Sequence, residues 1–174
     1  MTTPNHNLDL IPDGDQPWGQ RMRNNLSTID VALGKVRATM WALDNTQATD
    51  IITQNVPVKA NIPNTAGISP CGCIAFAPNR ATYTGTDRSI TVVASFTLDA
   101  VGNNKDYRVY LGHNGGIHQY SSAKVRDATA GSFGSGTLTG VVDIVSGDYL
   151  EMWVANLTDS ADVVFVDLSM TIHG

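Results

Sequence analysis

The chain has 174 residues, of which 16 are acidic and 11 basic, so its formal net charge is −5. This balance argues against a nucleic-acid partner, because binding to phosphates requires concentrated Lys and Arg. Only 16% of the residues are charged, against roughly 25% in an average soluble domain. Glu151 is the only Glu, and a chain poor in Glu and rich in Gly and Thr favours strands over helices. No apolar run approaches the ~20 residues that a membrane span requires, so no membrane insertion is expected.

Residues 1–17 form the first segment. Prolines and Gly14 interrupt it too often for a helix, and it holds too little apolar surface for a core of its own. Three apolar side chains, Leu8, Leu10 and Ile11, nevertheless stand within it, which a simple flexible leader would not need. The composition leaves two interpretations open: the segment is disordered, or it lies extended along a partner that supplies the missing contacts.

Residues 18–47 show a helical heptad pattern. Apolar residues recur at alternating spacings of four and three, which is the seam of a coiled coil: Met22, Leu26, Ile29, Leu33, Val36, Met40 and Leu43. A helix that packs on its own domain usually shows a wider apolar stripe, so the narrow seam favours self-association over that alternative. Leu at the a positions and β-branched residues at the d positions favour more than two helices. The pattern therefore predicts a coiled-coil helix over residues 18–47.

The rest of the chain is predicted to be a linker followed by β-structure. Prolines mark residues 48–70 as a linker that passes into short extended pieces. Turn residues separate the segments beyond it, and no helical pattern lies between them. A mainly β fold follows, with an antiparallel jelly-roll β-sandwich over residues 71–174. Apolar and polar residues alternate over 90–98, 107–111, 150–154 and 164–172, and more weakly over 72–77, 117–126 and 136–145.

Two details of this β region are specific enough to test. In the last strand, one face is expected to hold Val164, Val166, Leu168, Met170 and Ile172. The cysteines are separated by one residue, as Cys71-Gly72-Cys73, so they cannot join distant segments. Reduced structural thiols are expected, with a strained local disulfide or a site shared between subunits as the alternatives. Zinc would require further ligands that no spaced Cys or His pair supplies, so no metal or other cofactor is predicted.

Candidate groups for chemistry are few. His113 and His118 flank the turn residues 114–116, where they are either metal ligands or, as we favour, ordinary polar side chains of a hairpin loop. Asp143, Asp148 and Glu151 suggest the carboxylate pair of a glycosidase, but such acids are common on β surfaces. The sequence contains no nucleophile elbow, and the Gly-rich residues 131–136 lack the Lys-Ser/Thr of a phosphate-binding loop. The chain is therefore not expected to be an enzyme.

Aromatic residues with polar neighbours offer a second kind of site. Tyr110, Tyr120 and Trp153, with Tyr83, either stack on sugar rings or fill the sandwich core and a subunit interface. Trp153 lies opposite the apolar face of its strand, so one of the two faces must meet something other than its own core, which a subunit interface explains. Trp18, just before the heptads, either anchors the leader to a neighbouring protein or covers the end of the coiled coil.

Two stretches resemble known viral proteins. Asp15-Gln16-Pro17-Trp18-Gly19, followed by Asn24-Asn25-Leu26 and Ile29-Asp30, resembles the N-terminal region of tail-fibre and minor structural proteins of tailed bacteriophages. Residues 147–156 and the final strand look like the last two strands of the jelly-roll heads on phage fibres. Those heads are similar to trimeric complement-type and tumour-necrosis-factor-like domains. The resemblance implies a homotrimeric virion fibre or spike, made in the host cytoplasm and carried on the particle surface.

The resemblance also implies a role for each segment. The N-terminus would dock on another virion protein through Leu8, Leu10, Ile11 and Trp18, the heptads would hold three chains together, and the β head would face outward. The head would attach to the host surface, with a cell-surface glycan as the expected ligand. The alternative is a structural decoration or joint of the capsid or tail that recognises no host molecule.

Overall fold

The computed structural model describes residues 35–100, 102–127 and 132–174. The chain divides into two units, Met1–Lys35 and Val36–Gly174, and we call the second unit the head. Every regular element among the described residues is a β-strand, and the strand pairs are antiparallel. No helix in this part of the chain has the length and hydrophobicity that a membrane crossing requires.

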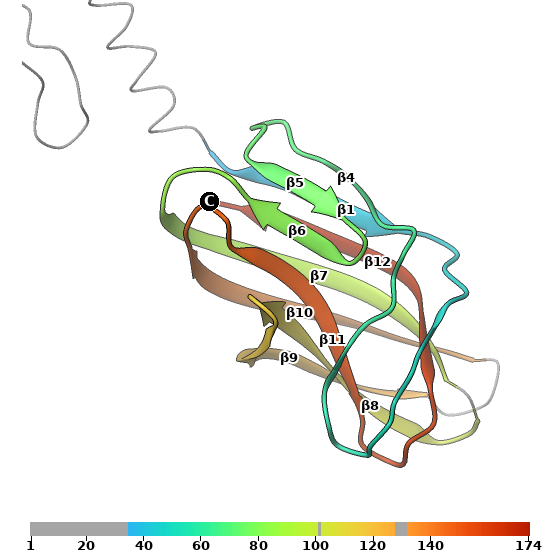
Figure 1. The fold of residues 1–174 in the computed structure, drawn as a ribbon. Coiled ribbons are helices and arrows are strands. Elements are labelled where there is room, and N and C mark those ends of the chain that lie inside the picture. The colour runs from blue at the N-terminus through green and yellow to red at the C-terminus, as the bar shows by residue number, and fades with distance from the viewer. Residues whose placement is uncertain (1–34, 101, 128–131) are drawn as a thin grey trace, which may run out of the picture. The chain divides into compact units, whose positions relative to one another are not determined.

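Two sheets stack as the layers of a sandwich (Figure 1). The first sheet has the strand order β10-β7-β12-β1-β4, and β2 also pairs with β12. The second has the order β5-β6-β11-β8-β9, and β3 also pairs with β11. The strands of the first sheet are β1 (Arg37–Ala42), β2 (Ala48–Thr49), β4 (Ala66–Ile68), β7 (Arg88–Ala100), β10 (Phe133–Ile144) and β12 (Val163–His173). Those of the second are β3 (Val58–Lys59), β5 (Ile74–Ala77), β6 (Arg80–Tyr83), β8 (Lys105–His113), β9 (Gly116–Asp127) and β11 (Tyr149–Asn156).

The core lies between the two sheets and follows the alternation in the sequence. Ile90, Val92, Ala94, Phe96 and Leu98 of β7 are buried, and Tyr107, Val109 and Leu111 of β8 face them from the second sheet. Because each strand of an antiparallel sandwich has one face in the core, apolar and polar residues must alternate along it. The predicted mainly β antiparallel sandwich is confirmed, and the chain crosses repeatedly between the sheets, as in a jelly roll.

The last strand, β12, departs from its predicted pattern at a β-bulge. Its register with β7 shifts between Phe165 and Asp167, so one extra residue reverses the alternation. The predicted face is therefore wrong at Val164 and Val166, which are only partly buried and point away from the core. The fully buried side chains are Val163, Phe165, Leu168, Met170 and Ile172.

The predicted helix over residues 18–47 is wrong in its last part, where the chain forms β1. Val36 and Met40 are buried in the core of the head, and Leu43 is 62% exposed. A spacing of four residues fits a strand as well as a helix, and Ala38 and Ala42 complete a period of two that the heptad interpretation overlooked. The other predicted seam residues, Met22, Leu26, Ile29 and Leu33, lie outside the described residues, as do Leu8, Leu10, Ile11 and Trp18.

Residues 48–70 belong to the head and are not a linker. They contribute β2, β3 and β4, and Ile51, Ala60 and Ile62 are buried. Two side-chain amides fix this irregular stretch: Asn45 donates to the Asn61 carbonyl at 3.2 Å, and Asn79 donates to the Ala60 carbonyl at 2.7 Å. Side chains thus satisfy backbone groups where prolines prevent regular pairing. The head begins at Val36, not at residue 71.

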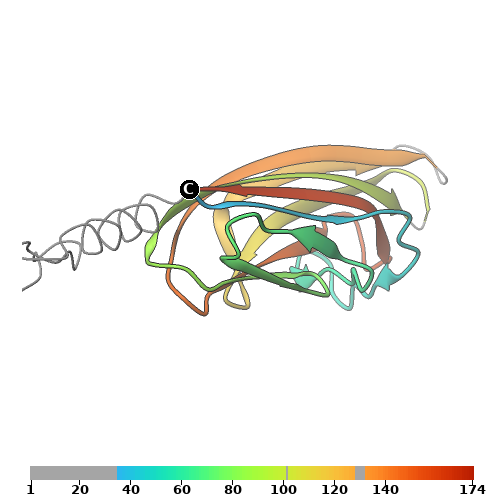
Figure 2. The same cartoon turned by 90° about the horizontal axis from the view of Figure 1, so that it is seen from above.

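The first and last strands of the head meet at one end of the sandwich. Val36 and Gly174 exchange backbone hydrogen bonds of 2.7 and 3.1 Å, and the C-terminus lies beside the start of β1 (Figure 2). Asn114 and Gly115 both have positive φ and join β8 to β9 in the two-residue hairpin that their sequence favours.

The Gly-rich residues 131–136 lie partly in β10, which begins at Phe133. Gly136 and Gly140 stand on inward positions of β10, where a methyl group at Gly136 would come within 2.7 Å of Phe96 and 2.8 Å of Val125. A methyl group at Gly140 would overlap the Ser121 side chain. These glycines let β10 lie close against β9 at the edge of the sandwich.

Candidate functional site

The outer face of the first sheet is the candidate site, and we call its central part the uncharged face. Alternate residues of β1, β12, β7 and β10 point away from the core, and strand register arranges them in rows. One row consists of Thr39, Thr171, Val93 and Thr139, and the next of Trp41, Ser169, Ser95 and Thr137. These two rows, which define the uncharged face, contain no charged side chain.

Charged residues stand around this area rather than within it. Arg37 and His173 lie beside each other at the end where the chain terminus is, and Asp143 lies on β10. At the opposite end are Asp99 and Asp167. The Ser89 hydroxyl donates to the Asp143 carboxylate, so this rim charge has a local partner.

Apolar side chains and a shallow hollow complete the surface. Leu43, Ile68, Phe133 and Val141 are each more than half exposed on this sheet or beside it. The hollow runs from Leu43 past Ser95 and Ser169 to Thr137. Within it, the hydroxyls of Ser95 and Thr137 lie 3.1 Å apart and hydrogen-bond to each other.

This arrangement suits association better than chemistry. General acid–base catalysis needs a titratable side chain, and the two central rows hold none. The buried centre of a protein interface, by contrast, is depleted of charged residues and rich in apolar and aromatic ones. The two central rows share the lack of charge but consist mostly of Thr and Ser. Their apolar members are Val93 and Trp41, and the exposed Leu43, Phe133 and Val141 lie around them.

The predicted aromatic site residues lie elsewhere. Tyr110 and Trp153 are neighbours on the outer face of the second sheet, where their Cα atoms are paired. Tyr120 projects from an irregular part of β9 and is 93% exposed, with its ring edge-on to His118. Tyr83 is fully buried and donates its hydroxyl to the Thr86 carbonyl at 2.5 Å, so it fills the core.

The predicted polar candidates have separate local partners. His113 lies 3.2 Å from Asp148, and the Nδ1 atom of His118 lies 2.8 Å from the Ser121 hydroxyl. Among the residues that the structure describes, no three His, Cys, Asp or Glu side chains form a group that would hold a metal. His113 therefore connects the end of β8 to the turn before β11, whereas His118 contacts a neighbour within β9.

The three acids singled out as a possible glycosidase pair are dispersed. Asp143 stands on the outer face of the first sheet and Glu151 on that of the second, with the sandwich between them. Asp148 caps the turn before β11. The backbone N–H of Val145 and the Asn114 amide, which both donate to this carboxylate, hold the pKa of Asp148 below its usual value, and His113 adds to the effect. Asp143 and Glu151 thus cannot act as a pair, because the sandwich separates them.

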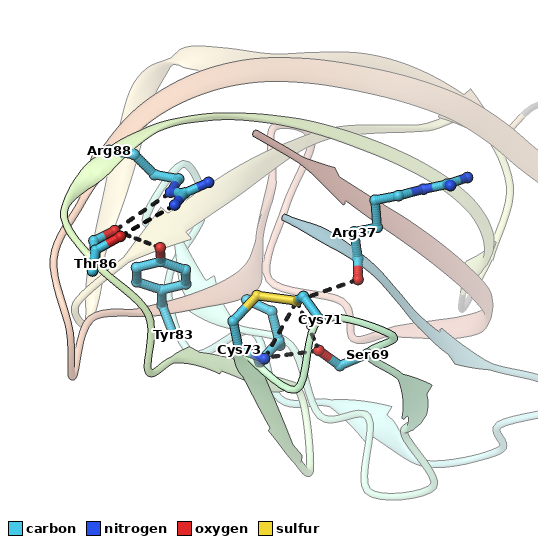
Figure 3. The surroundings of a disulfide bond; sticks show 8 residues. Arg37, Ser69, Cys71, Cys73, Tyr83, Thr86 and Arg88 are labelled. Carbon is cyan, nitrogen blue, oxygen red and sulfur yellow. Dashed lines mark hydrogen bonds between the residues drawn. A yellow bond between two sulfur atoms is a disulfide. The ribbon is translucent and has the colours of Figure 1, made fainter. Parts of the chain in front are cut away.

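Cys71 and Cys73 form a disulfide, so the expectation of reduced thiols is wrong (Figure 3). The chain turns sharply here, because the Gly72 N–H donates to the Ser69 carbonyl at 2.9 Å and Gly72 has a φ of 63°. This turn brings the two sulfurs together. Cys71 Sγ lies 3.6 Å from the Arg37 carbonyl oxygen, which places the disulfide beside β1.

The described residues define an antiparallel β-sandwich of jelly-roll type with one uncharged outer face. No family model and no curated protein matches the sequence. Among solved structures, the globular domain of zebrafish complement 1qA protein is 10% identical, covers 79% of this chain and 94% of its own, and has a TM-score of 0.45. Murine APRIL is 10% identical (78% and 98% covered, TM-score 0.49), and PRD1 vertex protein P5 is 13% identical (79% and 95% covered, TM-score 0.47). These likenesses concern the fold alone.

Proposed function

We propose that the chain is the subunit of a homotrimeric bacteriophage virion spike or fibre, docked on the particle by its N-terminus and attached to the host through its head. The uncharged face carries this proposal, since association with further copies explains a sheet surface without charges. The resemblance of residues 15–30 and 147–156 to phage fibre proteins supports a place on the virion. The head acts in this proposal by binding, without a catalytic step.

A closed ring of three copies needs two different surfaces on each copy, because the contacts run head to tail. The uncharged face is one of them. Tyr120 is our candidate for the centre of the other, since it is 93% exposed and projects from the edge strand β9. A Tyr that becomes buried in a partner's hollow is typical of an interface hot spot.

The mass of the full chain in solution tests the assembly. We expect about 55.8 kDa, which is three times the 18.6 kDa of one chain, by native mass spectrometry and by sedimentation over a dilution series. Ser95→Lys should shift the chain toward monomer, because it places a charge at the centre of the contact. Ser160→Lys is the matched control, since Ser160 is an exposed serine in the loop between β11 and β12, outside both proposed surfaces.

A monomeric wild-type chain would overturn the proposal. So would a Ser95→Lys variant that stays trimeric to the same dilution as Ser160→Lys, because the uncharged face would then not be the interface. The attachment role is tested by adsorption of the full chain to cells of permissive hosts. A trimer that adsorbs to none of them would be a structural decoration or joint of the particle.

A further inference from the structure

The outer face of the second sheet is basic, although the chain as a whole is acidic. The side chains concerned, which we call the basic face, are Lys59, Arg80, Arg108, Lys124 and Arg126, with Asp106 and Glu151 among them. Five cations against two carboxylates leave a charge of +3, whereas the chain carries −5. The uncharged face lies on the other sheet, so the contact made through it does not cover the basic face.

Glu151 organises one end of the basic face. Its carboxylate is only 1% exposed, and its Oε1 atom accepts from Lys59 Nζ at 2.5 Å and from Arg80 Nη2 at 3.0 Å. The two cationic side chains are 40% and 39% exposed, so their charges reach solvent while their positions are fixed. The Arg80 guanidinium also lies 3.9 Å from the centre of the Tyr149 ring. This cluster holds one excess positive charge.

Asp106 organises the other end. Its two carboxylate oxygens accept from Lys124 at 2.9 Å and from Arg126 at 2.8 Å, and the three side chains line a shallow hollow. Lys124 and Arg126, in that order, hold the pKa of Asp106 below its usual value. Arg108 is paired in register with Lys124 and has no carboxylate partner among the described residues. This cluster therefore holds two excess positive charges.

Trp153 and Tyr110 stand between the clusters. Register places Lys59, Trp153 and Tyr110 in one row across β3, β11 and β8. The Trp153 indole lies over Gly112, where a methyl group would overlap it, and its Nε1 atom is 3.4 Å from Glu151 Oε2. Gly112 thus lets the indole lie flat on the sheet with part of its surface exposed, which is the arrangement of a stacking platform.

The spacing of these parts is too great for one small anion. Tyr110 and Asp106 are four residues apart on β8, which corresponds to about 13 Å along the strand. Flat apolar rings with positive charge on either side suit an extended polymer in which sugar rings and anionic groups alternate.

We propose that the basic face binds a linear bacterial-surface polysaccharide with repeated carboxylate groups. Its sugar rings would stack on Trp153 and Tyr110, and its carboxylates would pair with the Lys59–Arg80 and Arg108–Lys124–Arg126 clusters. This inference rests on the proposed role in host attachment and specifies the class of ligand. A neutral glycan would leave the excess positive charge of the basic face without an anionic partner.

Binding of the full chain to defined polymers tests the ligand class. The probes are polygalacturonate, which has sugar rings and carboxylates, neutral dextran, which has only the rings, and polyaspartate, which has only the carboxylates. We expect polygalacturonate to bind at least about tenfold more tightly than either of the others, and to weaken as salt is added.

Substitutions on the two sheets test whether polygalacturonate binds at the basic face. Lys124→Gln combined with Arg126→Gln should weaken polygalacturonate binding by about tenfold, because two charge contacts are lost. Arg37→Gln combined with Arg88→Gln removes the same charge from the first sheet and should have little effect. Trp153→Ala and, separately, Tyr110→Ser should reduce the preference for polygalacturonate over polyaspartate, and melting curves would show that each variant is folded.

Each outcome is decisive and separable from the assembly test. Equal binding of polyaspartate, equal losses in the two double variants, or tighter binding of duplex DNA would overturn the inference. If the chain remained a trimer in that case, the proposed assembly would stand without this ligand. A monomer that still preferred polygalacturonate would overturn the assembly and keep the ligand.

Discussion

The two outer faces of the sandwich share an architecture and differ in chemistry. On the uncharged face, the central rows around Ser95 and Thr137 carry hydroxyl, Val and Trp side chains. On the basic face, the corresponding outward positions carry clustered cations around Glu151 and Asp106. The inward positions of both sheets are alike, with Ile, Val, Leu, Met and aromatic side chains.

This contrast shows that the inward half of each strand's alternation specifies the fold, and the outward half specifies what the fold can contact. Overall composition conceals the difference, because a face with a charge of +3 belongs to a chain with a charge of −5. A face without charges loses little when it is buried against a copy, whereas clustered cations are costly to desolvate and are better used at a surface that stays wet.

The largest expected effect comes from breaking the core that both faces share. Met40 is fully buried on β1, so Met40→Asp should cost more than about 4 kcal/mol and unfold the head, because it buries an unpaired charge. Leu43→Asp, at a 62% exposed position, should change the free energy of unfolding by less than about 1 kcal/mol. Urea denaturation of the full chain measures both.

This pair of variants also separates a strand from a coiled-coil seam. If residues 36–43 formed a helical seam, both substitutions would dissociate the trimer and leave the head folded. Equal effects of Met40→Asp and Leu43→Asp on assembly, without unfolding, would contradict the assignment of Met40 to the core.

A smaller effect, confined to one face, is expected from Glu151→Gln. The variant keeps the shape of the side chain but removes the charge that Lys59 and Arg80 share, so we expect a loss of about 1–3 kcal/mol. The charge of the basic face would rise from +3 to +4, and polygalacturonate should bind more tightly. Asp143→Asn, on the first sheet, should leave both quantities nearly unchanged. Weaker polymer binding by Glu151→Gln would mean that the carboxylate itself contacts the ligand.

Much of this fold could be predicted from the sequence, since the long strands carry their own pattern. The alternation over 90–98 and 107–111 predicted which side chains are buried. β1 could not be recognised, because the four-residue spacing from Val36 to Met40 satisfies two periodicities and only pairing with β12 and β4 decides between them. The bulge at Val166 likewise depends on register with a partner strand.

The candidate sites were less predictable than the fold. Tyr110 and Trp153 were singled out by their polar neighbours, and register does place them side by side. The cations of the basic face come from β3, β6, β8 and β9, and nothing in the sequence indicates that these strands lie on one layer. The uncharged face was visible only as an alternation of Thr and Ser opposite apolar residues, a signal that every half-exposed strand shares. The local disulfide was named only as an alternative to reduced thiols, because its formation depends on a turn at Gly72.

The smallest expected effect is that of acid, which should lower the stability of the head without weakening assembly through the uncharged face. The pKa values of Asp106, Asp148 and Asp159 lie below the usual value, mainly because of hydrogen bonds from Lys124, from the Val145 N–H and from Lys105, respectively. A lowered pKa in the folded state means that the carboxylate stabilises the head above the ordinary Asp value near pH 4, and that this contribution disappears as the pH falls through the lowered values. None of the three acids belongs to the uncharged face. The melting temperature of the full chain should therefore fall as the pH drops from about 5 to 3, while trimers that remain folded should dissociate no more readily.

Asp106→Asn should lower the melting temperature by a few degrees at neutral pH and flatten its decline in acid, because that variant has already lost the titrating group. A decline as steep as that of the wild type would show that acid acts through the turns at Asp148 and Asp159, and that the Asp106 cluster contributes charge to the basic face without contributing to its stability.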